Sequence, residues 1–163
     1  MDADFSHNPR YIPLLLEKAH EYDVVIGSRH IPGAQLKYPW HRRVISLSAV
    51  SSARWLMGLP VQDCTSAFRC LNRRAFGLIL DYGLFSEGYV FLVEMLCLLK
   101  KHGCTMEEVP IVFEDRTKGM SKMDAPREVI KGAISLLRLR LEESGLLGSL
   151  AGREAIVKDS VDN

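Results

Sequence analysis

The sequence contains little cysteine and no metal-binding arrangement of cysteine or histidine. Its 163 residues include four cysteines, none of which forms a C-x-x-C pair, and five scattered histidines without an H-x-x-x-H pair. No zinc site can be read from these residues. The apolar surroundings of most of the cysteines favour reduced, structural thiols in a cytosolic protein.

A long apolar run and a strong charge of one sign are also missing. No 18 consecutive residues are apolar and uncharged, and the N-terminus has neither the basic nor the apolar region of a signal peptide. We therefore expect neither a membrane-spanning nor a secreted chain. The net charge of +1 implies neither nucleic acid nor an anionic membrane as a partner, so only a local basic cluster could bind one.

The composition is sufficient for one globular domain with a core of its own. Hydrophobic residues make up 47% of the chain and charged residues 25%, as in ordinary soluble proteins. We expect this domain over residues 1–143, followed by a polar, disordered tail at 144–163.

Helical and extended patterns alternate along the chain, which predicts an α/β fold. Apolar residues at helical spacing predict helices over residues 11–20, 42–57, 73–80, 89–101 and 126–143. Extended segments are predicted at 23–29, as a buried strand of a parallel sheet, and at 63–71 and 107–114. Residues 30–41 are expected to form a loop, and Pro110 indicates an edge strand.

The first residues contain two carboxylates in an Asp-x-Asp pattern. In an extended segment Asp2 and Asp4 project to the same side, and Ser6 continues on that side as a third oxygen ligand. Such oxygens suit Mg²⁺ or Mn²⁺, which keep positions open for substrate phosphates. The alternative is a turn in which Asp4, Ser6 or Asn8 caps the following helix.

Two basic positions lie where an α/β sheet would bind a ligand. Arg29 ends the buried strand, and ligands of open α/β sheets bind outside the carboxyl ends of the strands. Arg42 and Arg43 open a helix, where the macrodipole does not favour cations. They are either solvated or face an anion at the start of the helix.

Two further segments allow two interpretations each, and one buried-looking carboxylate allows a structural one. The segment 115–122 contains three cations and a glycine, and it is either a plain charged loop or a loop that closes over a diphosphate. The final helix lies on a membrane surface or packs on the domain. Glu94 stands among apolar residues and is expected to be a paired, structural carboxylate.

Together these stretches resemble the second half of a dolichol- or polyprenol-phosphate mannosyltransferase of the family 2 glycosyltransferases. The matching stretches occur in the order of that family and are Met1–Pro9, Val25–Arg29, Arg42–Ser46, Asp63–Arg69, Gly88–Glu94, Glu108–Arg116 and Gly119–Lys122. One mild departure is Ala67, where many members of the family have glycine.

The resemblance implies a glycosyltransferase-A type fold that lacks its N-terminal nucleotide-binding half. The implied reaction, in a full-length parent, is the metal-assisted, inverting transfer of mannose from GDP-mannose to a polyprenyl phosphate. The chain alone is expected to be inactive. The parent is expected at the cytosolic face of a membrane, the endoplasmic reticulum in a eukaryote, with membrane-anchoring subunits as candidate partners and no nucleic acid.

The resemblance also implies roles for individual residues. Metal ligands are Asp2, Asp4 and Ser6, with Mg²⁺ or Mn²⁺ as the cofactor. The acceptor phosphate is assigned to Arg43 and Ser46. Residues assigned to the donor are Asp2, Ala3, Asp4, Ser6, Arg29, Arg116 and Lys122, of which Asp4, Arg29 and Arg116 are the catalytic ones.

Two other functions remain open from the sequence. One is a family 2 transferase that acts on a glycan hydroxyl or uses another nucleotide sugar. A hydroxyl acceptor would need a carboxylate base, for which Glu87 is the candidate, although a turn residue is its expected role. An ionised lipid phosphate needs positioning cations more than a base, which suits this chain better. The chain could instead be a non-catalytic fragment or a regulatory partner.

Overall fold

The computed structural model describes residues 7–37, 40–86, 88–114, 132 and 134–141, with the backbone alone at 36–37, 40–43, 45, 49 and 114. The tail predicted at 144–163 lies outside the described residues. The elements in chain order are η1 (Pro9–Tyr11), α1 (Ile12–Lys18), β1 (Val24–Ser28), β2 (Gln35–Lys37), α2 (Trp40–Met57), β3 (Arg69–Leu71), α3 (Arg73–Tyr82), α4 (Gly88–Lys101), β4 (Met106–Pro110) and β5 (Val112–Glu114).

A three-stranded sheet in the order β3-β1-β4 forms the centre of the fold. β1 runs parallel to β4, from Val24 opposite Met106 to Ser28 opposite Pro110, and antiparallel to β3. The predicted α/β fold is confirmed, although the sheet is mixed rather than parallel. Within the described strands β4 is an edge strand, as Pro110 predicted.

A second, two-stranded sheet pairs β2 with β5 in parallel. It corrects two predictions, because residues 30–41 contain a strand and the single strand expected at 107–114 is two. Only Ile111 separates β4 from β5, and its side chain is buried. Its N–H donates to the Ser28 carbonyl oxygen (3.0 Å), and its own carbonyl accepts from the Gln35 N–H (3.1 Å). The chain therefore leaves one sheet and enters the other without a loop.

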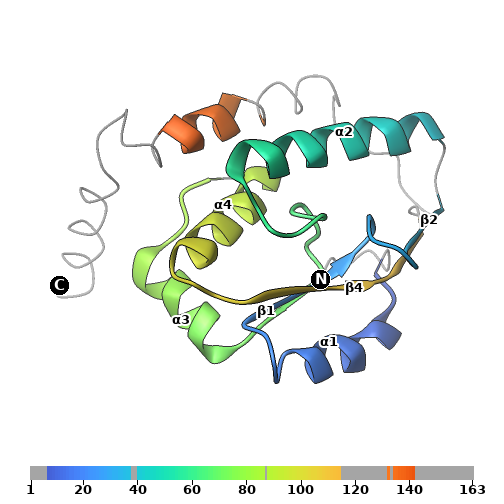
Figure 1. The fold of residues 1–163 in the computed structure, drawn as a ribbon, viewed down its shortest axis with the longest axis horizontal. Coiled ribbons are helices and arrows are strands. Elements are labelled where there is room, and N and C mark those ends of the chain that lie inside the picture. The colour runs from blue at the N-terminus through green and yellow to red at the C-terminus, as the bar shows by residue number, and fades with distance from the viewer. Residues whose placement is uncertain (1–6, 38–39, 87, 115–131, 133, 142–163) are drawn as a thin grey trace.

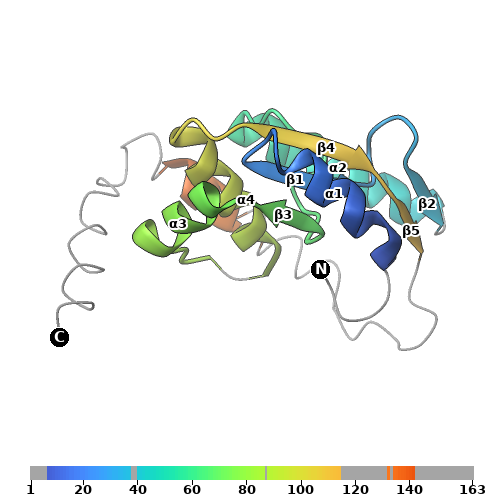
Figure 2. The same ribbon diagram turned by 90° about the horizontal axis from the view of Figure 1, so that it is seen from below.

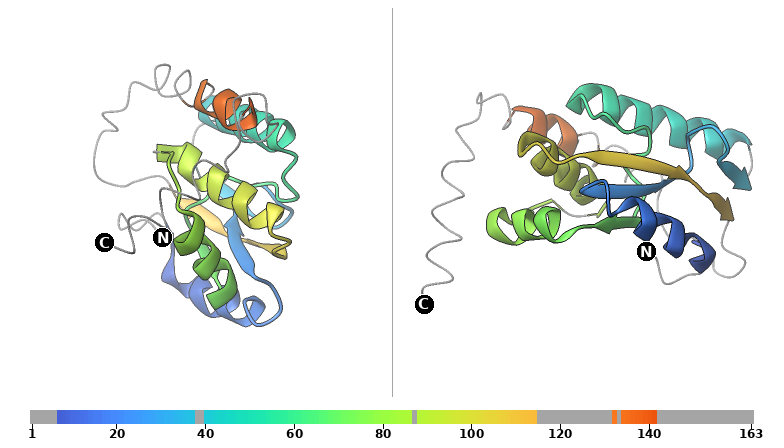
Figure 3. Two further views of the ribbon diagram at one scale, coloured as in Figure 1. Left: turned by 90° about the vertical axis from the view of Figure 1, so that its left-hand side faces the viewer. Right: turned by 60° about the horizontal axis from the view of Figure 1, so that its bottom comes forward.

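Helices cover both faces of the central sheet (Figures 1 and 2). Side chains of β1 alternate between the faces, so Val24 and Ile26 join one cluster and Val25 the other. The larger cluster contains buried residues of α2 and α4, and the smaller one contains Leu15 of α1. The right-hand view of Figure 3 shows α1 and α2 on opposite sides of the strands.

Two charged side chains of α4 have structural roles. Glu94 is buried and accepts hydrogen bonds from the backbone N–H groups of Phe85 (3.2 Å) and Ser86 (2.7 Å), as expected for a hydrogen-bonded carboxylate. Lys100 donates to the carbonyl oxygens of Met57 (3.3 Å) and Gly58 (2.7 Å). A cation there complements the negative end of the α2 dipole.

Residues 134–141 form a further helical stretch, part of the helix predicted at 126–143. Leu139 is buried in the larger core cluster, whereas Ile134, Leu137 and Leu141 are exposed. This part of the helix therefore packs on the domain with one side. Within the described residues, no helix combines the length and apolar character needed to cross a membrane.

The four cysteines are free thiols, as predicted. Cys64 is fully buried, and burial is the main reason that its pKa rises to about 11. The thiol therefore stays protonated near neutral pH. Its sulfur lies 3.7 Å from the carbonyl oxygen of Val50 in α2, so its role is packing.

Gly27 of β1 allows a close approach to Phe68, the residue before β3. A Cβ atom at Gly27 would lie 2.7 Å from Phe68 Cδ1 and 3.2 Å from the Phe68 carbonyl oxygen. We expect Gly27→Ala to lower the free energy of unfolding by about 1–3 kcal/mol, because the strand must shift. Urea unfolding followed by circular dichroism measures this change.

The matched control is Gly77→Ala in α3, where a Cβ atom would meet nothing within 4 Å. This variant should gain about 0.5–1 kcal/mol, because alanine has the better helix propensity. Equal stabilities of the two variants would contradict the close approach at Gly27.

Candidate functional site

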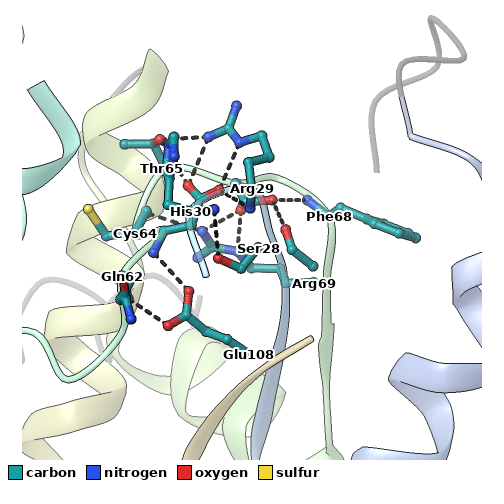
Figure 4. Close-up of polar contacts among 12 residues, drawn as sticks. Ser28, Arg29, His30, Gln62, Cys64, Thr65, Phe68, Arg69 and Glu108 are labelled. Atoms are coloured by element: carbon teal, nitrogen blue, oxygen red, sulfur yellow. Dashed lines mark hydrogen bonds and ion pairs between the residues drawn. The ribbon is translucent and has the colours of Figure 1, made fainter. Parts of the chain in front are cut away.

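The centre of the candidate site is an ion pair at the carboxyl end of β1. Arg29 Nε donates to Asp63 Oδ2 (2.7 Å) and Nη2 to Oδ1 (2.8 Å), while the Arg29 backbone N–H also donates to Oδ2 (2.9 Å). The side chains are 15% and 0% exposed. This two-pronged geometry is the strong form of an arginine–carboxylate contact (Figure 4).

Asp63 is held in place by its own backbone as well as by Arg29. Glu108 of β4 accepts hydrogen bonds from the N–H groups of Gln62 (2.6 Å) and Asp63 (2.9 Å). Thr65 accepts a further bond from Arg29 Nη2 (3.0 Å). The chain around Asp63 is therefore bonded to β4 on one side and to the end of β1 on the other.

Arg69, at the start of β3, holds the same loop from beneath (Figure 4). Its guanidinium donates to the carbonyl oxygens of Cys64 (3.2 Å), Ser66 (2.8 Å) and Leu92 (3.1 Å). Burial lowers the pKa of Arg69 to about 10, against the opposing effect of the nearby Asp63 charge. Arg69 is still charged at neutral pH, so the loop encloses two cations and one carboxylate.

The titration of Asp63 follows from these contacts. Burial by itself would raise the pKa of Asp63, but the hydrogen bonds and charge of Arg29 more than offset it, and the pKa lies below its ordinary value. Asp63 is therefore ionised at neutral pH. The Arg29 guanidinium is correspondingly oriented before any ligand arrives.

His7 reaches the same end of β1 from the start of the chain. It is buried and forms an antiparallel bridge with Phe113 of β5. Its ring stacks on Phe68 (centroids 5.1 Å apart) and meets the edge of Phe113 (5.4 Å). The Arg29 guanidinium carbon lies 5.4 Å from the Phe113 ring centre, within cation–π range. Residues near both predicted donor-binding segments thus lie beside Arg29.

Helix α2 approaches this region with its first turns. It begins beside β2, on the side toward which the carboxyl ends of β1 and β4 point (Figures 1 and 3). The backbone of Arg43 belongs to its first turn, and Ser46 is half-buried one turn later. Both predicted acceptor residues are therefore in the helix as expected.

The remaining predicted residues lie outside the described part of the chain, and their roles stay predictions. They are Asp2, Ala3, Asp4, Ser6, Glu87, Arg116 and Lys122. Among the residues that the structure describes, no group of three or more His, Cys, Asp or Glu side chains could hold a metal ion.

Four residues of the site were not assigned from the sequence: His7, Asp63, Arg69 and Glu108. A signal for two of them exists, since Asp63 and Arg69 enclose the uncharged run Cys64–Phe68, in a segment that was predicted as extended and that matches the family without a role being assigned to either residue. Opposite charges at both ends of a buried run must find partners. The partner of Asp63 is 34 residues away, which no local pattern reveals.

Comparison with known proteins gives two informative relatives. The chain is 32% identical over 160 residues to a polyprenol monophosphomannose synthase of Mycolicibacterium smegmatis, covering 97% of this chain and 58% of that protein. It is 38% identical over 124 residues to an undecaprenyl-phosphate mannosyltransferase of Micrococcus luteus, covering 76% and 51%. The chain thus spans about half the length of these curated relatives. No protein family model matches it.

The Arg29–Asp63 pair predicts a strong effect of one neutral substitution. Asp63→Asn leaves the Arg29 guanidinium, which is 15% exposed, without the carboxylate that it bonds, and we expect a loss of about 3–5 kcal/mol in the free energy of unfolding at pH 7. Chemical denaturation measures it. Asp81→Asn, on the exposed surface of α3, is the control and should change stability by less than about 0.5 kcal/mol.

The difference in the free energy of unfolding between the native chain and Asp63→Asn should depend on pH. Because the folded-state pKa of Asp63 is lowered, its contribution is fully present above the unfolded-state pKa of about 3.9 and is lost as the pH falls through the folded-state value. The stability difference between the native chain and Asp63→Asn should therefore narrow below about pH 4. A difference that stays constant down to pH 2 would contradict the ion pair.

Proposed function

We propose that this chain, which is similar over 97% of its length to a polyprenol monophosphomannose synthase and over 76% to an undecaprenyl-phosphate mannosyltransferase, forms part of an enzyme that transfers mannose from GDP-mannose to a polyprenyl phosphate. The similarity to a polyprenol monophosphomannose synthase across 97% of the chain carries the proposal. Because the matches cover only 58% and 51% of these relatives, the proposal assigns the activity to a protein of the relatives' length, of which this chain is a part. A glycosyltransferase-A type fold, with the nucleotide-binding half supplied outside this chain, is part of the proposal.

The bond changes are those of a single inverting displacement. An ionised oxygen of the lipid phosphate forms a bond to C1 of mannose on one face, while the C1–oxygen bond to GDP breaks on the other. GDP leaves with the electron pair of that bond. The nucleophile is already deprotonated at neutral pH, so no general base is needed, and the protein contributes position and positive charge.

Arg29 is suited to this task by its surroundings. Asp63 and Thr65 hold its guanidinium, so a cation fixed at the end of β1 awaits the donor. A fixed cation needs no reorientation when negative charge develops on the leaving diphosphate. Arg116 and Lys122 are the proposed further donor contacts, one as a bidentate fork and one as a point charge.

The acidic segment has the right donor set for a hard divalent cation. Asp2, Asp4 and Ser6 offer carboxylate and hydroxyl oxygens, which Mg²⁺ and Mn²⁺ prefer over nitrogen or sulfur ligands. His7, the residue that follows this segment in the sequence, stacks on Phe68 and forms a bridge with Phe113. When bound by this segment, the cation neutralises charge on the donor diphosphate.

Arg43 and Ser46 are proposed to bind the acceptor phosphate. Arginine and a hydroxyl both bond phosphate oxygens, and the first turns of a helix favour negative charge. The lipid tail of the acceptor requires the enzyme to work at a membrane surface, which we propose to be the cytosolic one. Membrane-anchoring subunits are candidate partners there.

The direct test is formation of a mannolipid. Purified enzyme of the relatives' length that carries this chain should transfer label from GDP-mannose to undecaprenyl or dolichyl phosphate in detergent micelles. Extraction into organic solvent, followed by mass spectrometry, identifies the product. Transfer from another nucleotide sugar only, or to a glycan hydroxyl only, would overturn the assignment.

Substitution of one acid tests the proposed metal. Asp4→Asn in that enzyme should abolish transfer while leaving the fold nearly intact, because an amide is a poor ligand for Mg²⁺ or Mn²⁺ and brings no charge. Transfer is measured with and without a strong chelator, and the fold by circular dichroism. An Asn variant that keeps full activity in the chelator would contradict the role of Asp4.

Substitution of Arg116 and of Arg43 should have different effects, because the first is proposed to bind the donor and the second the acceptor. Arg116→Ala should mainly weaken donor use, by about 2–5 kcal/mol in kcat/KM for a desolvated charge pair. Arg43→Ala should mainly impair use of the lipid phosphate and leave donor binding, measured by calorimetry, nearly unchanged. Arg116→Lys should not restore activity, because a point charge cannot replace the bidentate fork. If both alanine variants lost donor binding equally, the assignment of Arg43 to the acceptor phosphate would be wrong.

A further inference from the structure

We propose that Glu108 of β4 is a positioning residue, which aligns the Arg29 guanidinium through the backbone of the loop at Asp63. The inference rests on the proposed function, in which Arg29 faces the leaving diphosphate. All residues in this series of contacts belong to the part of the molecule that the structure describes. Figure 4 shows Glu108 at one end of the series and Arg29 at the other.

The first contact joins the Glu108 carboxylate to two consecutive backbone N–H groups. Oε2 accepts from the N–H of Gln62 (2.6 Å), and Oε1 accepts from the N–H of Asp63 (2.9 Å). Both oxygens are used, which fixes the orientation of the peptide groups on either side of Gln62. Hydrogen bonds to a carboxylate are roughly twice as strong as those between neutral groups. The loop is therefore held firmly at the residue that bonds Arg29.

The second contact joins the side chain of Asp63 to Arg29. The carboxylate accepts from Arg29 Nε (2.7 Å) and Nη2 (2.8 Å), and also from the Arg29 backbone N–H (2.9 Å). A bidentate pair of this kind brings the carboxylate and the guanidinium into fixed relative orientation. A rotation of the peptide groups at Asp63 would therefore also turn the Arg29 guanidinium.

Electrostatics alone would not favour a second carboxylate beside Asp63. The pKa of the Cys64 thiol is raised to about 11 by burial first, then by the charge of Asp63, and to a smaller extent by that of Glu108. Both negative charges thus act on the same residue of the loop, and like charges at one site disfavour each other. The two N–H groups offset this cost. A glutamine could not replace Glu108, because an amide has one acceptor oxygen and its other end is a donor.

The register of the sheet supports both ends of the series. β4 pairs with β1 so that Glu108 lies opposite Ile26, and Pro110 lies opposite Ser28, the residue before Arg29. The strand that carries Glu108 is therefore hydrogen-bonded to the strand that leads into Arg29. A cation fixed in this way needs no reorientation when charge develops on the leaving diphosphate.

Two other glutamates are matched controls. Glu94 of α4 accepts from the N–H groups of Phe85 (3.2 Å) and Ser86 (2.7 Å), which is the same kind of contact with consecutive residues of another loop. Glu107 precedes Glu108 in β4, and the alternation of side chains along a strand places it on the other face of the sheet. Glu94→Gln thus breaks an equivalent contact, and Glu107→Gln changes the neighbouring charge.

The first experiment uses the enzyme of the relatives' length and compares Glu108→Gln, Glu108→Asp and Glu107→Gln. Glutamine opposes one loop N–H with its own N–H group, and aspartate keeps the charge but withdraws the carboxylate by about 1.5 Å. Both Glu108 variants should lower kcat about tenfold and leave KM for GDP-mannose within about threefold, because a misaligned cation loses mainly transition-state stabilisation. Glu107→Gln should change neither quantity.

A double-mutant cycle with Arg29 then separates positioning from general destabilisation. Arg29→Lys keeps a positive charge beside the buried Asp63 but has no planar fork to align. In this background Glu108→Gln should change kcat by less than about twofold, whereas any effect of Glu94→Gln should be the same in both backgrounds. Fully additive effects of Glu108→Gln and Arg29→Lys, or an unchanged kcat in both Glu108 variants, would overturn the proposal.

A readout of Arg29 itself distinguishes failure of this inference from failure of the proposed function. In isotope-labelled enzyme, the NMR signal of the Arg29 Nε–H is identified by its loss in Arg29→Lys. Its hydrogen exchange with water should be about tenfold faster in Glu108→Gln and unchanged in Glu94→Gln and Glu107→Gln. If no mannolipid forms but this exchange accelerates, the proposed function is wrong and the positioning role of Glu108 stands. Unchanged exchange in Glu108→Gln would exclude that role even in an active enzyme.

Discussion

The structure around the candidate site depends on the buried carboxylate of Asp63, which lies between the partly buried guanidinium groups of Arg29 and Arg69. Asp63 receives both prongs of Arg29 and lies beside the charge of Arg69, which bonds only to carbonyl oxygens and a sulfur atom of its surroundings. Charges removed from water must be neutralised nearby, so the loop 63–68 can adopt this path only if all three groups are in place. The loop therefore fixes the position of Arg29, and Arg29 in turn fixes the conformation of the loop.

This dependence means that polar contacts fix the geometry of the loop at the carboxyl end of β1. Apolar packing tolerates small shifts, whereas a bidentate pair does not. Glu108 extends the same constraint to β4 by accepting two backbone N–H groups of the loop. Both parallel strands of the central sheet thus contribute to the position of a single cation at their carboxyl ends.

Local patterns in the sequence predicted much of the fold, because helices α1 to α4 carry their apolar residues at helical spacing and β1 is a short β-branched run. They did not predict β2, a three-residue strand whose partner β5 is far along the chain. The role of Asp63 was missed for the same reason, since its pairing with Arg29 is a long-range contact. Arg29 itself was found, because the end of a buried parallel strand identifies a ligand-binding position. Of the residues assigned from family resemblance, Arg29, Arg43 and Ser46 belong to the described part of the chain, whereas Asp2, Asp4, Ser6, Arg116 and Lys122 lie outside it.

Ile111 has a mechanical consequence for the molecule. Its backbone joins the two sheets through bonds to Ser28 and Gln35, and its buried side chain fills the point where β4 becomes β5. A displacement of β5 must therefore be transmitted to Ser28, the residue bonded to Arg29, with no loop to absorb it. β4 and β5 therefore behave as one continuous, stiff segment. A force that displaces β5 would therefore also displace Arg29. Ile111, which has no reactive group, thus determines how accurately Arg29 is positioned.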